Sequence, residues 1–203
     1  MALVLGLWAV TNLPWTLDDY DQAKQAYTSF EMVGQGHWFY EHTPNEGVAT
    51  KPPLVGWISA GLFEVTRWWE GAWRLPSFAA AVLLLWLIGR WATTAYGATA
   101  GVLALGAFGL NLLAPRLATL VRTDMPLALV TFLIGAQIWR KIQRGEEWNA
   151  RDRWLAFGLL TVAMWIKGPI VYAFILTGLV AYHCRRRNNV TPGGRCGRWT
   201  WVF

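Results

Sequence analysis

Hydrophobic residues fill long stretches of the chain, and polar residues collect in the segments between them. Several of these apolar runs approach the roughly 20 residues that a helix needs to cross the hydrocarbon core of a bilayer. Membrane-spanning helices are therefore predicted at residues 75–95, 97–113, 125–139, 154–166 and 169–184. The pattern predicts an all-α fold, a polytopic transmembrane helical bundle.

Residues 1–14, "MALVLGLWAVTNLP", are apolar but short for a complete span. They lack the basic amino-terminal region and the small-residue cleavage site of a signal peptide. A first transmembrane helix with a clipped start is therefore favoured over a signal sequence.

The longest polar region covers residues 15–72 and holds eight acidic residues against three basic ones. A low content of Lys and Arg indicates a segment outside the cytoplasm. Within it, "DQAKQAYTSFEMVGQG" predicts a helix that begins near Asp21 and ends at Gly34 and Gly36. A second helix is predicted from "PPLVGWISAGLFEVTRWW", which has proline in its first turn. We expect both to be interfacial helices in this first extracytoplasmic loop.

Composition supports a membrane protein, because 55% of the residues are hydrophobic and only 15% are charged. A soluble domain usually has about a quarter of its residues charged. The net charge of +6 comes from Lys and Arg clustered beside the apolar runs, as at residues 139–153 and 185–187. Such clusters are typical of cytoplasmic loops and argue against nucleic acid as a partner.

Residues 1–184 are expected to form one membrane-embedded region, followed by a basic tail at residues 185–203. The Gly, Arg and Trp mixture of the tail resembles neither a helix nor an ordinary linker. It fits a disordered end or a read-through of the wrong frame. Cys184 and Cys196 imply no disulfide framework and no metal site.

Four ionisable residues fall on the extracytoplasmic side in this topology: Asp21, Lys51, Asp124 and Lys167. Ionisable groups at membrane depth are costly, so they are candidates for function. If these two carboxylates and two lysines meet at one cavity, they suit a phosphate-bearing substrate and a base that activates its acceptor.

Structural roles compete with these assignments. Asp21 and Asp124 also suit helix N-termini, where acids cap or complement the helix dipole. Three cations equally suit anchoring at the membrane interface: Lys51, Arg74 and Lys167. Asp18 and Asp19 have the character of solvated loop charges.

At these residues the chain resembles the polyprenyl-phosphate-sugar glycosyltransferases of the GT-C class. These include aminoarabinose transferases acting on lipid A and relatives of protein O-mannosyltransferases. The similarity covers about residues 18–182, and it rests on motifs that occur in the family's order: "DQAKQAYTSFEMVGQGHW", "KPPLVGW", "RLPS", "RTDMPLAL" and "IKGP".

The resemblance implies a role for each motif residue. Asp21 would be the catalytic base, and Asp124 would line the same cavity. Lys51 would contact the donor phosphate, with Lys24 where the aminoarabinose transferases have arginine. Lys167 is the lysine of the family's "KGP" element, and Arg74, in "RLPS", is a further candidate for substrate binding.

The implied reaction moves a sugar from a polyprenyl-phosphate donor to a lipid, glycan or protein acceptor, with inversion. The implied location is a bacterial inner membrane, among membrane lipids. A lipid or sugar-lipid transporter remains an alternative, because it could use the same charged cavity. An inactive truncated remnant is a further alternative, because family members are much longer than this chain.

A metal cofactor is not established by these motifs, although a divalent cation stays open. Aminoarabinose transferases commonly have an acid implicated in metal binding before the lysine-proline pair, and here Thr50 stands there. His37, His42 and His183 show no ligand spacing, which argues against a metal site built from histidines.

Overall fold

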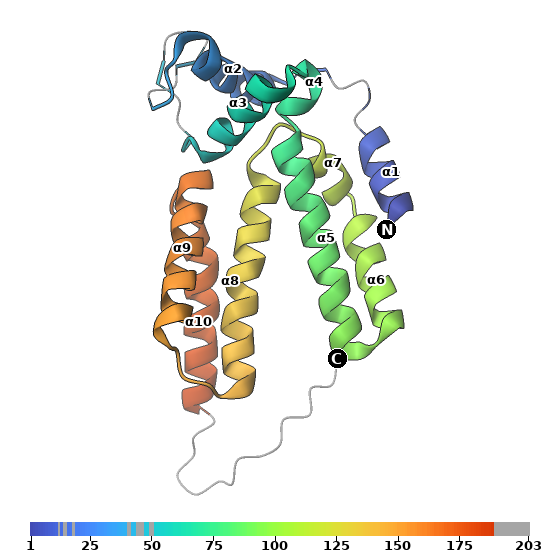
Figure 1. Ribbon diagram of the computed structural model, residues 1–203. Coiled ribbons are helices and arrows are strands. Elements are labelled where there is room, and N and C mark those ends of the chain that lie inside the picture. The colour runs from blue at the N-terminus through green and yellow to red at the C-terminus, as the bar shows by residue number, and fades with distance from the viewer. Residues whose placement is uncertain are drawn as a thin grey trace, which may run out of the picture. The chain divides into compact units, whose positions relative to one another are not determined.

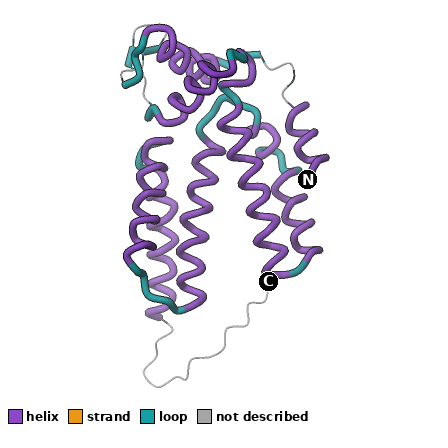
Figure 2. Tube along the Cα trace, in the orientation of Figure 1, coloured by secondary structure: helices purple, strands orange, loops and turns teal. Residues whose placement is uncertain are grey.

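The computed structural model describes residues 1–11, 13, 16–17, 19–39, 42–43, 47–48 and 51–188, with side chains up to Tyr182. The regular structure of this part is helical, apart from an isolated antiparallel bridge between His42 and Val48 (Figures 1 and 2). The helices are α1 (Ala2–Thr11), α2 (Tyr20–Gln35), α3 (Leu54–Thr66), α4 (Trp69–Ala72), α5 (Leu75–Tyr96), α6 (Ala98–Gly109), α7 (Ala114–Ala118), α8 (Asp124–Arg144), α9 (Ala150–Lys167) and α10 (Ile170–Asn188). One compact unit covers Met1–Val171, and a second begins at Tyr172.

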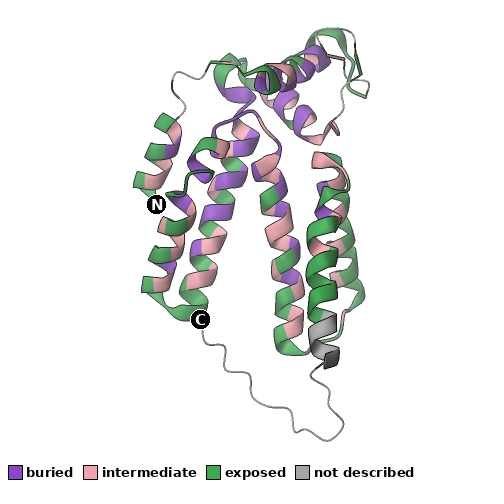
Figure 3. Ribbon diagram, turned by 180° about the vertical axis from the view of Figure 1, so that it is seen from behind, coloured by how far each residue is buried: buried purple, intermediate pink, exposed green. Residues whose placement is uncertain are grey.

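Two helices are long and apolar enough to cross a bilayer, α5 with 22 residues and α8 with 21. Shorter apolar helices are α1, α3, α6 and the Ile170–Tyr182 part of α10. Exposed residues line much of α6 and α9 (Figure 3), including large apolar side chains such as Val102, Trp154 and Phe157. Such a surface fits lipid, so the prediction of an all-α membrane fold is confirmed.

The predicted span at residues 97–113 is too long, because α6 ends at Gly109 and the next helix, α7, begins only at Ala114. Asn111 causes the break, since its side-chain oxygen accepts hydrogen bonds from the backbone N–H groups of Leu113 and Ala114. Pro115 then lies in the first turn of α7, where a missing N–H costs nothing.

Other predicted boundaries shift for local reasons. Helix α9 begins at Ala150, earlier than predicted, because Asn149 and Asp152 form a capping box. Helix α8 continues to Arg144 and stops at Gly145, whose φ is 61°. Helix α10 continues to Asn188, into the segment predicted to be tail.

The packing between α5, α6, α7 and α1 has few bulky residues. Ala80, Ala81, Leu85, Ala114, Ala118 and Met125 surround the buried Trp8. The indole N–H of Trp8 donates to the carbonyl of Gly109 at 2.8 Å. Gly101 of α6 allows close approach to α5, since a Cβ there would lie 1.9 Å from the Thr93 hydroxyl. Small residues at such crossings are typical of membrane helices.

Helices α2, α3 and α4 lie over the ends at which α5 and α8 begin (Figure 1). Phe30, Phe63, Trp69 and Trp73 join these three helices, with neighbouring ring centroids 4.8 to 5.8 Å apart. Edge-on and offset stacking of this kind adds to the stability gained by burial alone. The location of α2 and α3 along the membrane surface stays a prediction.

Candidate active site

The first turn of α2 presents two carboxylates. Asp19 is the N-cap residue, and its side chain accepts a hydrogen bond from the backbone N–H of Asp21. The capping alternative for Asp21 is therefore wrong, and Asp19 is an exposed charge before the helix, as predicted, that also caps it. Asp18 lies outside the described residues. Asp21 is left with an exposed carboxylate whose Oδ1 has no hydrogen bond within the described part of the chain.

Arg122 lies against both acids. Its Nη2 is 3.4 Å from Oδ2 of Asp19 and 3.4 Å from Oδ2 of Asp21. Sequence reasoning missed this residue, although it opens the "RTDMPLAL" motif two positions before Asp124. A cation beside an acid that begins a membrane helix is the signal that would have singled it out.

Two hydrogen bonds place the residues beside this ion pair. Gln22, next to Asp21, is buried and accepts from the backbone N–H of Val121 at 3.2 Å. Ser77 donates from its hydroxyl to the carbonyl of Arg122 at 2.5 Å. These hydrogen bonds fix the start of α2 and the segment before α8 next to each other, and so fix the positions of Asp21 and Arg122.

Arg74 completes this framework. Its Nη1 donates to the Thr119 carbonyl at 2.6 Å and to the Gln22 side chain at 3.3 Å, and its Nη2 donates to the Thr16 carbonyl at 3.1 Å. The residue is 4% exposed. Burial lowers the pKa of Arg74, but an arginine stays protonated in proteins. These contacts are with the protein itself, and substrate binding by Arg74 stays a prediction.

A second ion pair joins α8 to α9. Asp124 is the first residue of α8 and Lys167 the last of α9, and their side chains meet at 2.5 Å between Oδ1 and Nζ. Each charge complements the dipole of its own helix. Both side chains are about one third exposed, so the pair is accessible. The structure thus brings together two of the residues predicted to share a site.

Lys24 and Lys51 are half-buried and form no ion pair with a residue that the structure describes. Lys51 precedes α3, whose Trp57 packs against Trp165 of α9 with ring centroids 5.1 Å apart. Trp165 lies two residues before Lys167. The start of α3 therefore lies beside the end of α9 that carries the Asp124–Lys167 pair.

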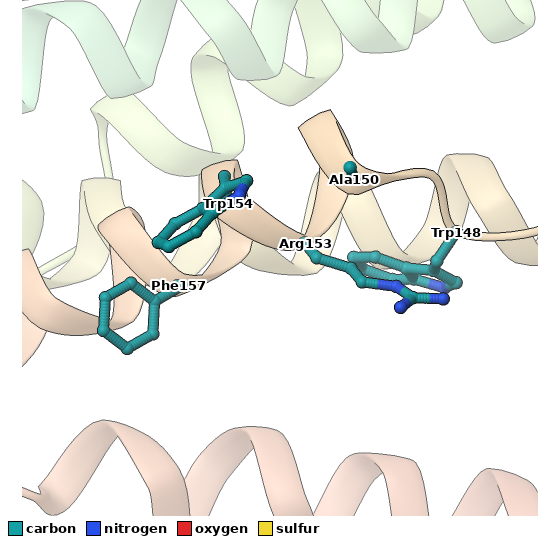
Figure 4. A pocket seen from close by; sticks show the side chains of 5 residues that line it. All are labelled: Trp148, Ala150, Arg153, Trp154 and Phe157. Carbon is teal, nitrogen blue, oxygen red and sulfur yellow. The ribbon is translucent and has the colours of Figure 1, made fainter.

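Two open pockets lie away from these ion pairs. One of about 340 Å³ is lined by Gly36, Trp38, Phe39 and Trp57, between the end of α2 and the start of α3. The other, of about 570 Å³, lies at the opposite end of α9 and is lined by Trp148, Ala150, Arg153, Trp154 and Phe157 (Figure 4). Only the first lies on the same side as the predicted site.

The structure also gathers groups that can hold a metal ion. Glu31, His37 and His42 place one ligand atom each within 4.8 Å of one another. The sequence spacing did not predict this convergence. The side chain of His183 and the whole of Thr50 lie outside the described part of the chain.

Comparison with known families bears on these motifs. The family model for dolichyl-phosphate-mannose-protein mannosyltransferase matches residues 50–195, well over half of the chain. The chain belongs to this family. The match includes "KPPLVGW", "RLPS", "RTDMPLAL" and "IKGP", and the resemblance to GT-C glycosyltransferases is confirmed. No curated protein matches the chain.

Two solved structures support the fold. One is ArnT from Cupriavidus metallidurans bound to undecaprenyl phosphate, with 26% identity and a TM-score of 0.74 over 93% of this chain. The other is the apo state of the same protein, with 24% identity and a TM-score of 0.70 over 92% of this chain. This chain covers 35% of the ArnT chain in each case, so it spans about a third of the length of these relatives.

Proposed function

We propose that the chain supplies the amino-terminal catalytic part of a glycosyltransferase that uses a polyprenyl-phosphate-linked sugar. Support comes from its family, and from its 26% identity to a protein solved with undecaprenyl phosphate bound. The observation that carries the proposal is the meeting of Asp21 with Arg122, close to the start of α8. At one face of the membrane, a carboxylate can act as a general base and cations can stabilise the charge of a leaving phosphate.

In this proposal Asp21 is the catalytic base. Its Oδ2 is held by Arg122, and its Oδ1 accepts the proton of an acceptor hydroxyl. The acceptor oxygen attacks the anomeric carbon as the bond from that carbon to the phosphate oxygen breaks. The electron pair of that bond leaves on the polyprenyl phosphate, so one displacement inverts the centre.

The lysines stabilise charge that develops on the leaving phosphate. Lys51 contacts the phosphate in this account, and like Lys24 it has no anionic partner among the described residues. Lys24 lies one turn after Asp21 on α2 and supports the same phosphate. Lys167 is neutralised by Asp124, so this pair orients the acceptor, and Asp124 assists as base once substrate separates the pair.

We place the reaction on the extracytoplasmic side of a bacterial inner membrane. Basic residues cluster at the ends of α8 and α9 remote from Asp124 and Lys167, as at Arg140, Arg144 and Arg151. Cytoplasmic loops carry such an excess of Lys and Arg. The acceptor is a lipid, glycan or protein with a free nucleophilic group.

The experiment that tests this proposal follows a labelled sugar from a polyprenyl-phosphate donor in proteoliposomes. A glycosyltransferase yields label covalently attached to an acceptor and releases free polyprenyl phosphate. A transporter moves the intact labelled donor between leaflets without releasing the phosphate, and that outcome would replace the proposal.

A further inference from the structure

Helix α2 carries a buried carboxylate near its end, Glu31, that faces two imidazoles. Glu31 is 7% exposed. Its Oε1 lies 4.0 Å from Nδ1 of His37 and 4.0 Å from Nδ1 of His42. Within the described residues, no Lys or Arg lies within ion-pair distance of Glu31. A buried carboxylate without a cation is costly, so this group calls for a positive partner.

The second oxygen of Glu31 is held separately. The backbone N–H of His42 donates to Oε2 at 3.2 Å. A hydrogen bond of this kind orients a metal-binding carboxylate and leaves its other oxygen for the ion. The two imidazole rings stand edge to face, with centroids 5.2 Å apart, so both reach the same side of Glu31.

The chemistry of this group matches a transition-metal dication. We propose that Glu31, His37 and His42 bind one zinc ion, the carboxylate through Oε1 and each histidine through a ring nitrogen. Ligand bonds of about 2.0–2.2 Å place ligand atoms roughly 3.3 Å apart in a tetrahedral site. The observed 4.0 Å separations close to that value with side-chain shifts of less than about 1 Å. The fourth position is left for water.

The zinc site is separate from the Asp21–Arg122 pair. Glu31 lies ten positions after Asp21 on α2, a distance of about 15 Å along a helix. Zinc would instead fasten His37 and His42 to the end of α2. The residue after His37 is tied to α3, because the indole N–H of Trp57 donates to the Trp38 carbonyl at 2.6 Å. The ion would therefore steady the connection that leads to Lys51.

The test measures zinc bound to the purified chain in detergent, and it needs no transferase activity. The protein is stripped with a chelator, reloaded with zinc chloride, desalted and analysed by mass spectrometry for metal. We expect about one zinc ion per chain in the parent and in His183→Asn, the matched control. Affinity should fall at least about tenfold in Glu31→Gln, His37→Asn and His42→Asn.

Cobalt serves as a second probe and is measured on the parent protein alone. This measurement therefore does not depend on whether the variants fold. Cobalt held by imidazole and carboxylate gives visible absorption without the thiolate charge-transfer band expected from Cys184 or Cys196. Zinc binding that is equal in the parent and the three variants, or a thiolate band, would overturn the proposal. So would a parent that takes up no zinc.

Discussion

The guanidinium of Arg122 lies 3.4 Å from a carboxylate oxygen of Asp21, a residue 101 positions earlier in the chain. Their neighbours also meet: the backbone N–H of Val121, which precedes Arg122, donates to the side chain of Gln22, which follows Asp21, at 3.2 Å. Two consecutive positions on each segment therefore meet. This double contact places Asp21 against the segment that leads into α8, two positions before the acid of the "TDMP" element.

Replacing Arg122 tests whether this contact matters for chemistry. In Arg122→Gln we expect sugar transfer to fall on the order of 100-fold, because a misplaced catalytic group costs about that much. Arg122→Lys should recover part of the loss by restoring the charge. Arg67→Gln, which removes an exposed pair with Glu64 on α3, is the control and should keep full activity. Equal rates in Arg122→Gln and the control would remove Arg122 from the site.

Lys51 is expected to affect donor binding and leave the fold intact. Lys51→Gln should weaken photolabelling by a reactive undecaprenyl phosphate analogue roughly 10-fold or more, because a charge-assisted hydrogen bond contributes about 1.5–3 kcal/mol. Arg90→Gln is a matched control, since Arg90 lies over the Trp86 ring near the far end of α5. Undiminished labelling of Lys51→Gln would exclude the phosphate contact.

Arg74 should act on stability. Arg74→Met removes the hydrogen bonds that the guanidinium donates to the Thr119 and Thr16 carbonyls, and a hydrogen bond to a charged group contributes about 1.5–3 kcal/mol. Each kcal/mol lowers Tm by about 2–4 °C for a chain of this size. Thermal unfolding in detergent checks the shift, with Arg67→Met as the exposed control. A variant with parental Tm and lost donor binding would instead favour the substrate role predicted from the sequence.

The contact between α5 and α6 makes a matched pair of glycine substitutions informative. Gly101→Ala would place a methyl group 1.9 Å from the Thr93 hydroxyl, whereas nothing lies within 4 Å of a Cβ at Gly106. We expect Gly101→Ala to cost about 1–3 kcal/mol by overpacking. Gly106→Ala, in the same helix, should leave Tm unchanged or raise it. Equal Tm values for the two variants would contradict this packing.

Local signals predicted the helices well. Gly36 ends α2 with φ at 75°, as predicted from the sequence, and proline marked the start of α3. The break at Asn111 was missed, because a single side chain capping two backbone N–H groups competes with an unbroken apolar pattern.

The site was predictable only in part. The motifs picked out Asp21, Asp124 and Lys167, because ionisable residues beside membrane helices are rare. The motifs did not indicate that Arg122 would meet Asp21, or that His37 and His42 would converge on Glu31. Such contacts depend on how α2 packs and how its loop turns back, which no local periodicity encodes.

The most direct measurement compares Asp21→Asn with Asp19→Asn in transfer of labelled sugar from a polyprenyl-phosphate donor. Asparagine caps helices as well as aspartate does, so Asp19→Asn keeps the start of α2 and removes one carboxylate from Arg122. We predict that Asp21→Asn lowers the rate by about 10²–10⁴-fold, the usual contribution of a general base, while Asp19→Asn stays within a few-fold of the parent. Transfer by Asp21→Asn at the parental rate would contradict the account.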